Sequence, residues 1–93
     1  MKVRISDGAE FDFEHMADGI ATIDPALAEA TASRVKAAAA EIGRPPHHFA
    51  PVAGRVNLRK RRMPPYLILF SIEDDHILIL RIVHERSDWM ALV

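Results

Sequence analysis

The sequence has no cysteine, one tryptophan, one tyrosine and only four glycines among its 93 residues. The lack of cysteine excludes disulfide scaffolds and thiolate zinc sites, and it fits a reducing compartment. No apolar run approaches the ~18 residues that a membrane-spanning helix needs, and no amino-terminal segment has the form of a secretory signal. We therefore expect one soluble, cytoplasmic domain covering residues 1–93, with no membrane contact.

A large excess of either charge is also missing, since the formal net charge is −1 at pH 7. The charge is nevertheless uneven: residues 1–43 contain four Lys/Arg and eight Asp/Glu, whereas residues 44–93 contain eight and five. Five of those eight cations lie between Arg55 and Arg62. Proteins that bind the nucleic-acid backbone usually carry a net positive charge, so direct nucleic-acid binding is not the favoured function.

What the sequence does contain is a pair of long apolar segments, residues 66–73 and 76–84, which predict a β-hairpin around Asp74 and Asp75. Both segments are rich in β-branched and aromatic residues, and Asp tolerates the left-handed backbone of a tight turn. Their nearly continuous apolar character is typical of strands in the middle of a sheet, covered on both faces.

A two-residue loop at Asp74 and Asp75 would fix the pairing of these strands. The expected pairs are Ile72 with Ile77, Phe70 with Ile79, Ile68 with Arg81, and Tyr66 with Val83. Arg81 would then share a face with Phe70 and require water or a carboxylate partner, because an unpaired buried charge is costly. His84 would point to the opposite face.

Two amphipathic helices are predicted before the hairpin. The first begins at Ser6 or Asp7, which can cap it, and its apolar stripe is Phe13, Met16, Ala17 and Ile20. The second begins at Asp24 and Pro25, a strong start signal, and its apolar positions are Ala28, Ala32, Val35, Ala39 and Ile42. We expect Gly43 to end it in the left-handed conformation. The short connection predicts an antiparallel helical hairpin, and the alanines of the second helix allow another element to approach closely.

Two further strands complete the pattern. Residues 2–5 alternate polar and apolar side chains, which predicts a short edge strand. Residues 55–63 predict a strand with Val56 and Leu58 on one face and a basic outer face, after a proline-rich loop at residues 44–54. The order β-α-α-β-β-β predicts an α+β fold, in which a helical hairpin packs on a small, mainly antiparallel twisted sheet and a short C-terminal tail follows.

The histidines outside the hairpin offer little chemistry. His47 and His48 are adjacent, but no third ligand lies at a suitable spacing, so we expect a solvated loop and no metal site. His15 and His76 are expected on the surface. The sequence has no phosphate-binding glycine loop, nucleophile elbow or carboxylate cluster with metal spacing, so we expect no cofactor.

Two groups of residues are better candidates for function. The first is the basic run Arg59, Lys60, Arg61 and Arg62. Four cations this close repel one another unless a negative group is near, so the run could contact phosphate or an acidic partner; a solvated strand end is the alternative.

The second group is Arg81, His84, Arg86 and Trp89. These residues could form an RNA-cleaving site, in which Arg81 stabilises charge on phosphate and His84 acts as general acid or base. The alternative, which we favour, is structural: Arg81 pairs with Asp88 or Glu85, and Trp89 anchors the tail in the core.

The residues 65–70 (PYLILF) and 77–89 (ILILRIVHERSDW) resemble the ParE/RelE superfamily of type II toxin–antitoxin toxins. The stretch ILRIVHERSDW is similar to the closing motif of the ParE branch, and Asp24-Pro25 between two helices is similar to the family's helical hairpin. The resemblance covers most of the chain. It implies a toxin that a co-expressed antitoxin holds inactive in a hetero-oligomer, with roles in plasmid maintenance and stress response.

The resemblance also implies two possible mechanisms. RelE-like members cut mRNA on the ribosome with basic residues, often with a terminal Tyr or His, whereas ParE-like members poison DNA gyrase by protein contact. Trp89 stands at the position of the terminal Tyr and has no phenolic hydroxyl, and the chain is not basic overall. Both departures favour the ParE-like mechanism.

We therefore expect a ParE-like toxin without catalytic turnover that inhibits DNA gyrase and is neutralised by a cognate antitoxin lying against the helical hairpin and sheet. The expected partner-binding residues are Arg59, Lys60, Arg61, Arg62, Arg81, His84, Arg86 and Trp89. One alternative is a RelE-like mRNA endoribonuclease that uses Arg81, His84 and Arg86. Another is a toxin fold that has lost its toxicity and persists as a binding module.

Overall fold

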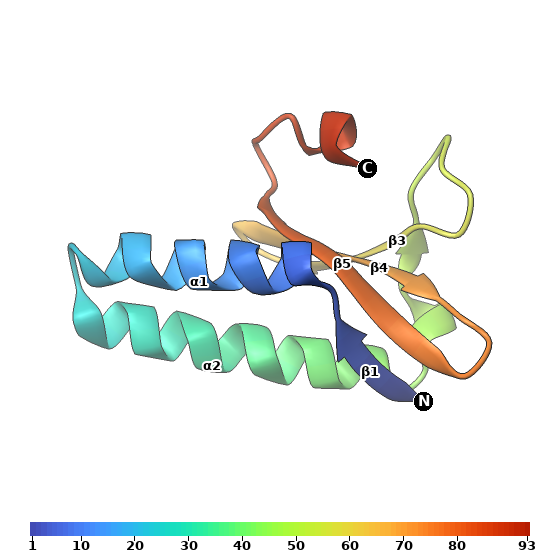
Figure 1. Cartoon of the computed structure of the whole chain (residues 1–93), viewed down its shortest axis with the longest axis horizontal. Coiled ribbons are helices and arrows are strands. Elements are labelled where there is room, and N and C mark those ends of the chain that lie inside the picture. Colours follow the sequence, from blue (N-terminus) through green and yellow to red (C-terminus); the bar gives the residue numbers. More distant parts are fainter.

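In the computed structural model, which describes residues 1–93, a helical hairpin covers one face of a five-stranded sheet (Figure 1). The elements are β1 (Lys2–Ile5), α1 (Asp7–Ala21), α2 (Pro25–Ile42), a 3-10 turn (Pro46–His48), β2 (Ala50–Pro51), β3 (Arg59–Met63), β4 (Tyr66–Ile72), β5 (His76–His84) and a terminal 3-10 segment (Trp89–Leu92). The strand order is β1-β5-β4-β3-β2, with β1 parallel to β5 and the other pairs antiparallel. The predicted α+β class and helical hairpin are confirmed. No helix is both long enough and apolar enough to cross a membrane.

Both helices begin where their capping residues predict. The Ser6 hydroxyl accepts a hydrogen bond from the Ala9 N–H at 3.1 Å, and Asp24 Oδ1 accepts one from the Leu27 N–H at 3.1 Å. Pro25 occupies the first helical position, where its missing N–H costs nothing. These caps fix both starts and leave a short connection that turns the chain back on itself.

The prediction for Gly43 is wrong. Its φ is −68°, an ordinary helical value, so no left-handed cap forms. A Cβ at this position would lie 2.7 Å from the Met1 carbonyl oxygen and 3.2 Å from a Val3 methyl group. Glycine is therefore needed because the beginning of β1 crosses the end of α2 at close range.

The predicted hairpin register holds only for its first half. Phe70 lies opposite Ile79, as expected, but Leu69 lies opposite Arg81, so β5 contains one extra residue at Leu80. Beyond this β-bulge the predicted pairs are wrong by one position: Ile68 faces Ile82 and Tyr66 faces His84. A bulge moves every later side chain to the other face, so His84 shares the face of Tyr66 and does not oppose it.

The predicted strand at residues 55–63 is too long. β3 begins only at Arg59, and Val56 is 99% exposed. Asn57 has φ +52°, a left-handed conformation that Asn tolerates. Its side-chain amide donates to the Ile72 carbonyl at 3.0 Å and its Oδ1 accepts from the Ile72 N–H at 3.3 Å. Those bonds replace the strand ladder that the alternating pattern predicted. A short strand not expected from the sequence, β2, pairs with β3 instead.

The sheet buries apolar side chains on both faces, as the continuous apolar runs predicted. The core between helices and sheet contains Ala9, Val35, Ala38, Ile42, Met63, Ile68, Phe70, Ile77, Ile79 and Ile82. The core on the other face contains Val52, Leu58, Leu67, Leu69 and Val83, and the tail residues Trp89 and Met90 pack against it. The tail therefore completes the second core.

Candidate functional site

The start of α1 is bound to the edge of β5 just beyond the point where β1 ends. The Ser6 N–H donates to the Ile79 carbonyl at 2.9 Å, and the Ser6 hydroxyl donates to the Leu80 carbonyl, also at 2.9 Å. The same hydroxyl caps α1. These bonds satisfy β5 carbonyls at the bulge, where β1 supplies no partner.

Asp12 of α1 continues this attachment and holds Arg81. The Arg81 Nε and Nη2 donate to the two carboxylate oxygens of Asp12 at 2.7 and 2.9 Å, and the Ile82 N–H donates to Asp12 Oδ2 at 3.0 Å. The Asp12 side chain is 10% exposed and that of Arg81 30%. Hydrogen bonding to Asp12 raises the pKa of Arg81 above its ordinary value, although partial burial opposes the shift. The expectation of a carboxylate partner is correct, but the partners named from sequence, Asp88 and Glu85, are not the ones that bind.

His84 lies at the far end of β5 in a different setting. Its Nδ1 accepts a hydrogen bond from the Arg86 N–H at 3.1 Å, which in the neutral ring leaves the proton on Nε2. Its ring meets the Tyr66 ring edge-on at 5.9 Å between centroids. A cleft of about 230 Å³ between α1 and the strand ends is lined by Asp12, His15, Met16, Tyr66, Ile82, Val83 and His84. The His84 side chain is exposed, and its Nε2–H is free to donate a hydrogen bond.

The tail crosses to the other face of the sheet. Trp89 packs against the second core, as the structural alternative expected. The Arg55 Nε donates to the Val93 carbonyl at 3.2 Å and its Nη2 to the Met90 carbonyl at 3.1 Å, so this loop residue holds the 3-10 segment in place. No cavity is lined by two of the four residues Arg81, His84, Arg86 and Trp89. The four residues therefore do not share a cavity, and the one contact among them that involves a side chain is that of the Arg86 N–H with the His84 ring.

The basic run is divided between two faces of β3. Arg59 donates to the Phe49 carbonyl at 2.7 Å, and Arg61 pairs with Glu41 of α2 at 2.6 Å while its guanidinium lies 5.5 Å from the Phe49 ring centroid. Arg62 projects from the alternate face and reaches Glu85 at 3.5 Å. Glu41 and Glu85 relieve much of the repulsion that the run predicted.

Of the four remaining histidines, His15, His47 and His48 occupy the surface as expected, whereas His76 is only partly exposed. His47 and His48 lie exposed in the 3-10 turn after α2, and His15 stacks on the exposed Phe11 ring at 5.9 Å on the outside of α1. His76 is partly buried beside the turn, where its Nδ1 lies 2.6 Å from Asp75 Oδ1. Hydrogen bonding and charge from His76 lower the pKa of Asp75.

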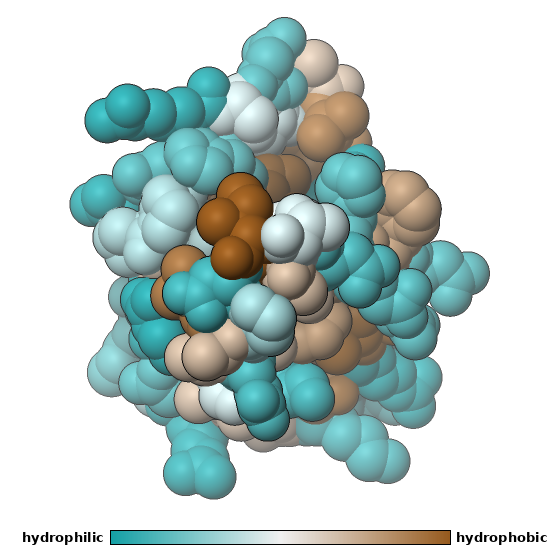
Figure 2. Space-filling model, turned by 90° about the vertical axis from the view of Figure 1, so that its left-hand side faces the viewer, coloured by the Kyte–Doolittle hydropathy of each residue, from teal (hydrophilic) through white to brown (hydrophobic).

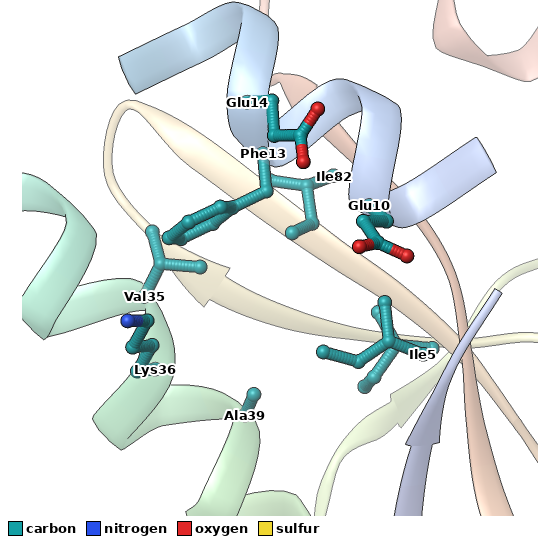
Figure 3. Close-up of a pocket in the computed structure, with 9 residues that line it drawn as sticks. Ile5, Glu10, Phe13, Glu14, Val35, Lys36, Ala39 and Ile82 are labelled. Carbon is teal, nitrogen blue, oxygen red and sulfur yellow. The ribbon is translucent and has the colours of Figure 1, made fainter. Parts of the chain in front are cut away.

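A groove between the two helices was not predicted from the sequence (Figure 3). Its volume is about 360 Å³, and it is lined by Ile5, Glu10, Phe13, Glu14, Val35, Lys36, Ala39, Ile79 and Ile82. β5 provides the floor, and small Ala39 faces the space from α2 (Figure 3). The only sequence signal was the alanine-rich second helix, which allows close approach of another element.

Comparison with known proteins identifies the class that this fold and its sites define. Residues 3–89 match the family described as "ParE toxin of type II toxin–antitoxin system, parDE". The chain therefore belongs to the ParE toxin family of type II toxin–antitoxin systems. No curated protein sequence matches it.

Solved structures share the fold. A structure of the chromosomal ParDE toxin–antitoxin system from P. aeruginosa is 18% identical with a TM-score of 0.79, and the match covers 90% of this chain and 95% of that one. The RelBE2 complex from Mycobacterium tuberculosis is 23% identical, with a TM-score of 0.62 over 89% and 95%. The RelB-RelE complex from Methanococcus jannaschii is 18% identical, with a TM-score of 0.61 over 91% and 93%.

Proposed function

We propose that this toxin acts in the cytoplasm by protein–protein contact, with DNA gyrase as its target, and that a cognate antitoxin neutralises it. One observation carries the proposal: Asp12 engages Arg81 through two hydrogen bonds. Asp12 occupies the Nε–Nη2 edge of the guanidinium and offsets its charge, which disfavours Arg81 as a phosphate clamp in RNA cleavage. The ParE family membership supports the same choice.

The target-facing surface in this proposal is formed by the tail, residues 84–93, together with the exposed cations of β3. Arg62 and Arg86 are exposed, and Arg62 makes only a long contact to Glu85. Lys60, on the same face of β3 as Arg62, and Trp89 are partly covered and support this surface. Arg59 and Arg61 point to the other face of β3, where Arg61 pairs with Glu41 of α2, and lie outside it. The antitoxin would lie against the helical hairpin and the sheet, because an amphipathic segment can bury its apolar side chains there.

A supercoiling assay tests this mechanism. Purified toxin added to DNA gyrase should inhibit supercoiling and trap a covalent gyrase–DNA complex, and stoichiometric antitoxin should reverse both effects. The double variant Arg62→Glu/Arg86→Glu should inhibit less, whereas Arg34→Glu, an exposed α2 position outside the surface, should inhibit as the unmodified toxin does. Full gyrase activity with no trapped complex would contradict the proposal.

The second candidate is a RelE-like, ribosome-dependent mRNA endoribonuclease. The exposed His84 favours it, because no hydrogen bond occupies its Nε2 and its ring lies against that of Tyr66. Primer extension on mRNA from expressing cells separates the two mechanisms. Cuts within codons that disappear with His84→Ala would replace gyrase contact as the mechanism.

A further inference from the structure

A cavity at the end of the sheet collects basic side chains that lie outside the proposed target-facing surface. It is formed by the 3-10 turn after α2, the loop before β3 and the end of β4, and its volume is about 240 Å³. In Figure 1 the loop before β3 and the β4–β5 turn lie at this same end of the molecule. Two arginines, Arg55 and Arg59, and the imidazole of His47 line the cavity, and none of its lining residues is acidic.

Neither arginine of this cavity has a carboxylate partner within ion-pair distance. Arg59 donates from Nη1 to the Phe49 carbonyl, and its Nε and Nη2 make no hydrogen bond. Arg55 donates from Nε, Nη1 and Nη2 to backbone carbonyls, which leaves an N–H on each Nη without a partner. Two like charges that line one cavity repel each other, so a bound anion would stabilise the pair.

His47 supplies a third donor to the same cavity. Of the two adjacent histidines in the 3-10 turn, only His47 lines the cavity, whereas His48 does not. The histidine rings that make hydrogen bonds within the chain are those of His76 and His84, so the His47 ring is unpaired. A neutral imidazole donates from one ring nitrogen and a protonated one from both. Three side chains from three different segments can therefore donate to one anion.

The size and charge of the cavity match a single phosphate group. Its volume of about 240 Å³ is below the roughly 300–1,000 Å³ of sites that enclose a whole small molecule. Arginine binds phosphate oxygens through paired N–H groups, and a phosphomonoester carries a charge of about −1.5 to −2 at pH 7, which offsets two guanidinium groups. One negative group is near, since Glu73 Oε2 lies 3.4 Å from the Asn57 amide nitrogen at the rim.

We infer that this cavity binds phosphate, either as the free inorganic ion or as the phosphate group of a small phosphomonoester. Arg55 and Arg59 hold the anion between them, and His47 donates to it from the 3-10 turn. Arg55 also connects the site to the C-terminal tail, because its Nε and Nη2 donate to the Val93 and Met90 carbonyls. A phosphate on the free edge of the same guanidinium restrains that side chain, so the tail detaches less often when the site is occupied.

NMR titration of the full-length, ¹⁵N-labelled toxin with inorganic phosphate, at constant ionic strength, tests the site. The Nε–H signals of Arg55 and Arg59 should shift with one saturating curve. Arg59→Gln should weaken binding by roughly tenfold, because a charge-assisted pair is lost at a partly exposed position. His47→Gln should weaken it by about threefold, whereas the matched control His48→Gln should stay within about 1.5-fold of the unmodified toxin.

Two further measurements separate the sources of phosphate and test the electrostatics. Glycerol 3-phosphate that binds more tightly than inorganic phosphate would identify a phosphomonoester as the ligand, and the reverse order would identify the free ion; glycerol alone should cause no shift. Glu73→Gln should tighten phosphate binding by about twofold, because it removes the one nearby negative charge.

The fluorescence of Trp89 tests the connection to the tail. Acrylamide quenching should slow when phosphate is added to the unmodified toxin or to His48→Gln, and should change less at the same phosphate concentration in Arg59→Gln. Saturable binding without any change in quenching would overturn the connection to the tail and leave the site. Shifts that never saturate, or equal affinity in Arg59→Gln, His47→Gln and His48→Gln, would indicate an adventitious ion only and overturn the site itself.

Discussion

Asp12 and Arg81, 69 positions apart in sequence, form a two-bond ion pair that fastens α1 to the bulged part of β5. Asp12 Oδ2 also accepts a hydrogen bond from the Ile82 N–H, so one carboxylate binds both the Arg81 side chain and the β5 backbone. The pair explains how a cation is tolerated on a central strand. It also occupies the Nε–Nη2 edge of the guanidinium that a phosphate-binding site would use.

Removal of the Asp12 carboxylate should therefore destabilise the protein strongly. Asp12→Ala leaves Arg81 partly buried without its partner and the Ile82 N–H without an acceptor, which we expect to cost about 2–4 kcal/mol, below the full value for buried pairs because Arg81 is partly exposed. Urea unfolding of Asp12→Ala, Arg81→Met and the double variant forms a thermodynamic cycle. A coupling energy of about 1–3 kcal/mol is expected, and simple additivity would contradict a direct pair.

Replacing Gly19 and Gly43 by alanine should change the stability of the protein in opposite directions. Gly19 has no atom within 4 Å of an added Cβ, so Gly19→Ala should stabilise α1 by about 0.5–1 kcal/mol. Gly43→Ala would bring its Cβ to 2.7 Å from the Met1 carbonyl and should cost about 1–3 kcal/mol as β1 and α2 separate. Thermal melting of the two variants provides the measurement. A stabilising Gly43→Ala would show that the crossing of β1 and α2 is not tight.

Most elements of the fold follow from local signals. Asp24 and Pro25 identify the start of α2 because capping and the missing N–H act within one turn, and the two apolar runs identify β4 and β5 because their composition is itself the signal. Asp74 and Asp75 similarly locate the turn, whose closing bond runs from the Glu73 N–H to the His76 carbonyl.

The features missed from the sequence depend on distant partners. The bulge at Leu80 is stabilised by Ser6 and Asp12, which no pattern within β5 reveals. The alternation at residues 55–58 resembles a strand, yet the Asn57 side chain binds Ile72 of a neighbouring strand and bends the chain instead. The groove lies where α1, α2 and β5 meet, and helical periodicity does not encode how these elements pack against one another.

The tip of the helical hairpin presents apolar surface. Ile23 is 87% exposed and Leu27 52%, and Figure 2 shows strongly apolar side chains at this end of the molecule among hydrophilic ones. We expect Ile23→Ser to leave stability within about 0.5 kcal/mol of the unmodified protein, because the side chain is already in water. Urea unfolding measures this. A loss above about 1 kcal/mol would mean that Ile23 contributes to packing against α1.

The pKa of Asp75, in the β4–β5 turn, should depend on its contact with His76. Hydrogen bonding and charge from His76 lower the pKa of Asp75, so His76→Gln should return that pKa toward its ordinary value. Because the folded-state pKa is depressed, the contact stabilises the fold above the unfolded-state pKa and loses its effect as pH falls through the folded-state value. Carboxyl-carbon NMR titration of Asp75 in both proteins provides the measurement. An unchanged pKa would show that the contact is absent in solution.

Arg55 donates hydrogen bonds to the Met90 and Val93 carbonyls. The fluorescence of Trp89, the single tryptophan, can report whether these bonds hold the tail in place. Arg55→Ala removes both bonds, so the 3-10 segment should detach more often and expose Trp89 to water. We expect red-shifted emission, faster acrylamide quenching and a stability loss of about 1 kcal/mol, since each bond lies at the surface. Arg44→Ala, at another exposed loop arginine, serves as the control and should leave the spectrum unchanged. Identical quenching in both variants would mean that packing of Trp89 against the second core holds the tail without Arg55.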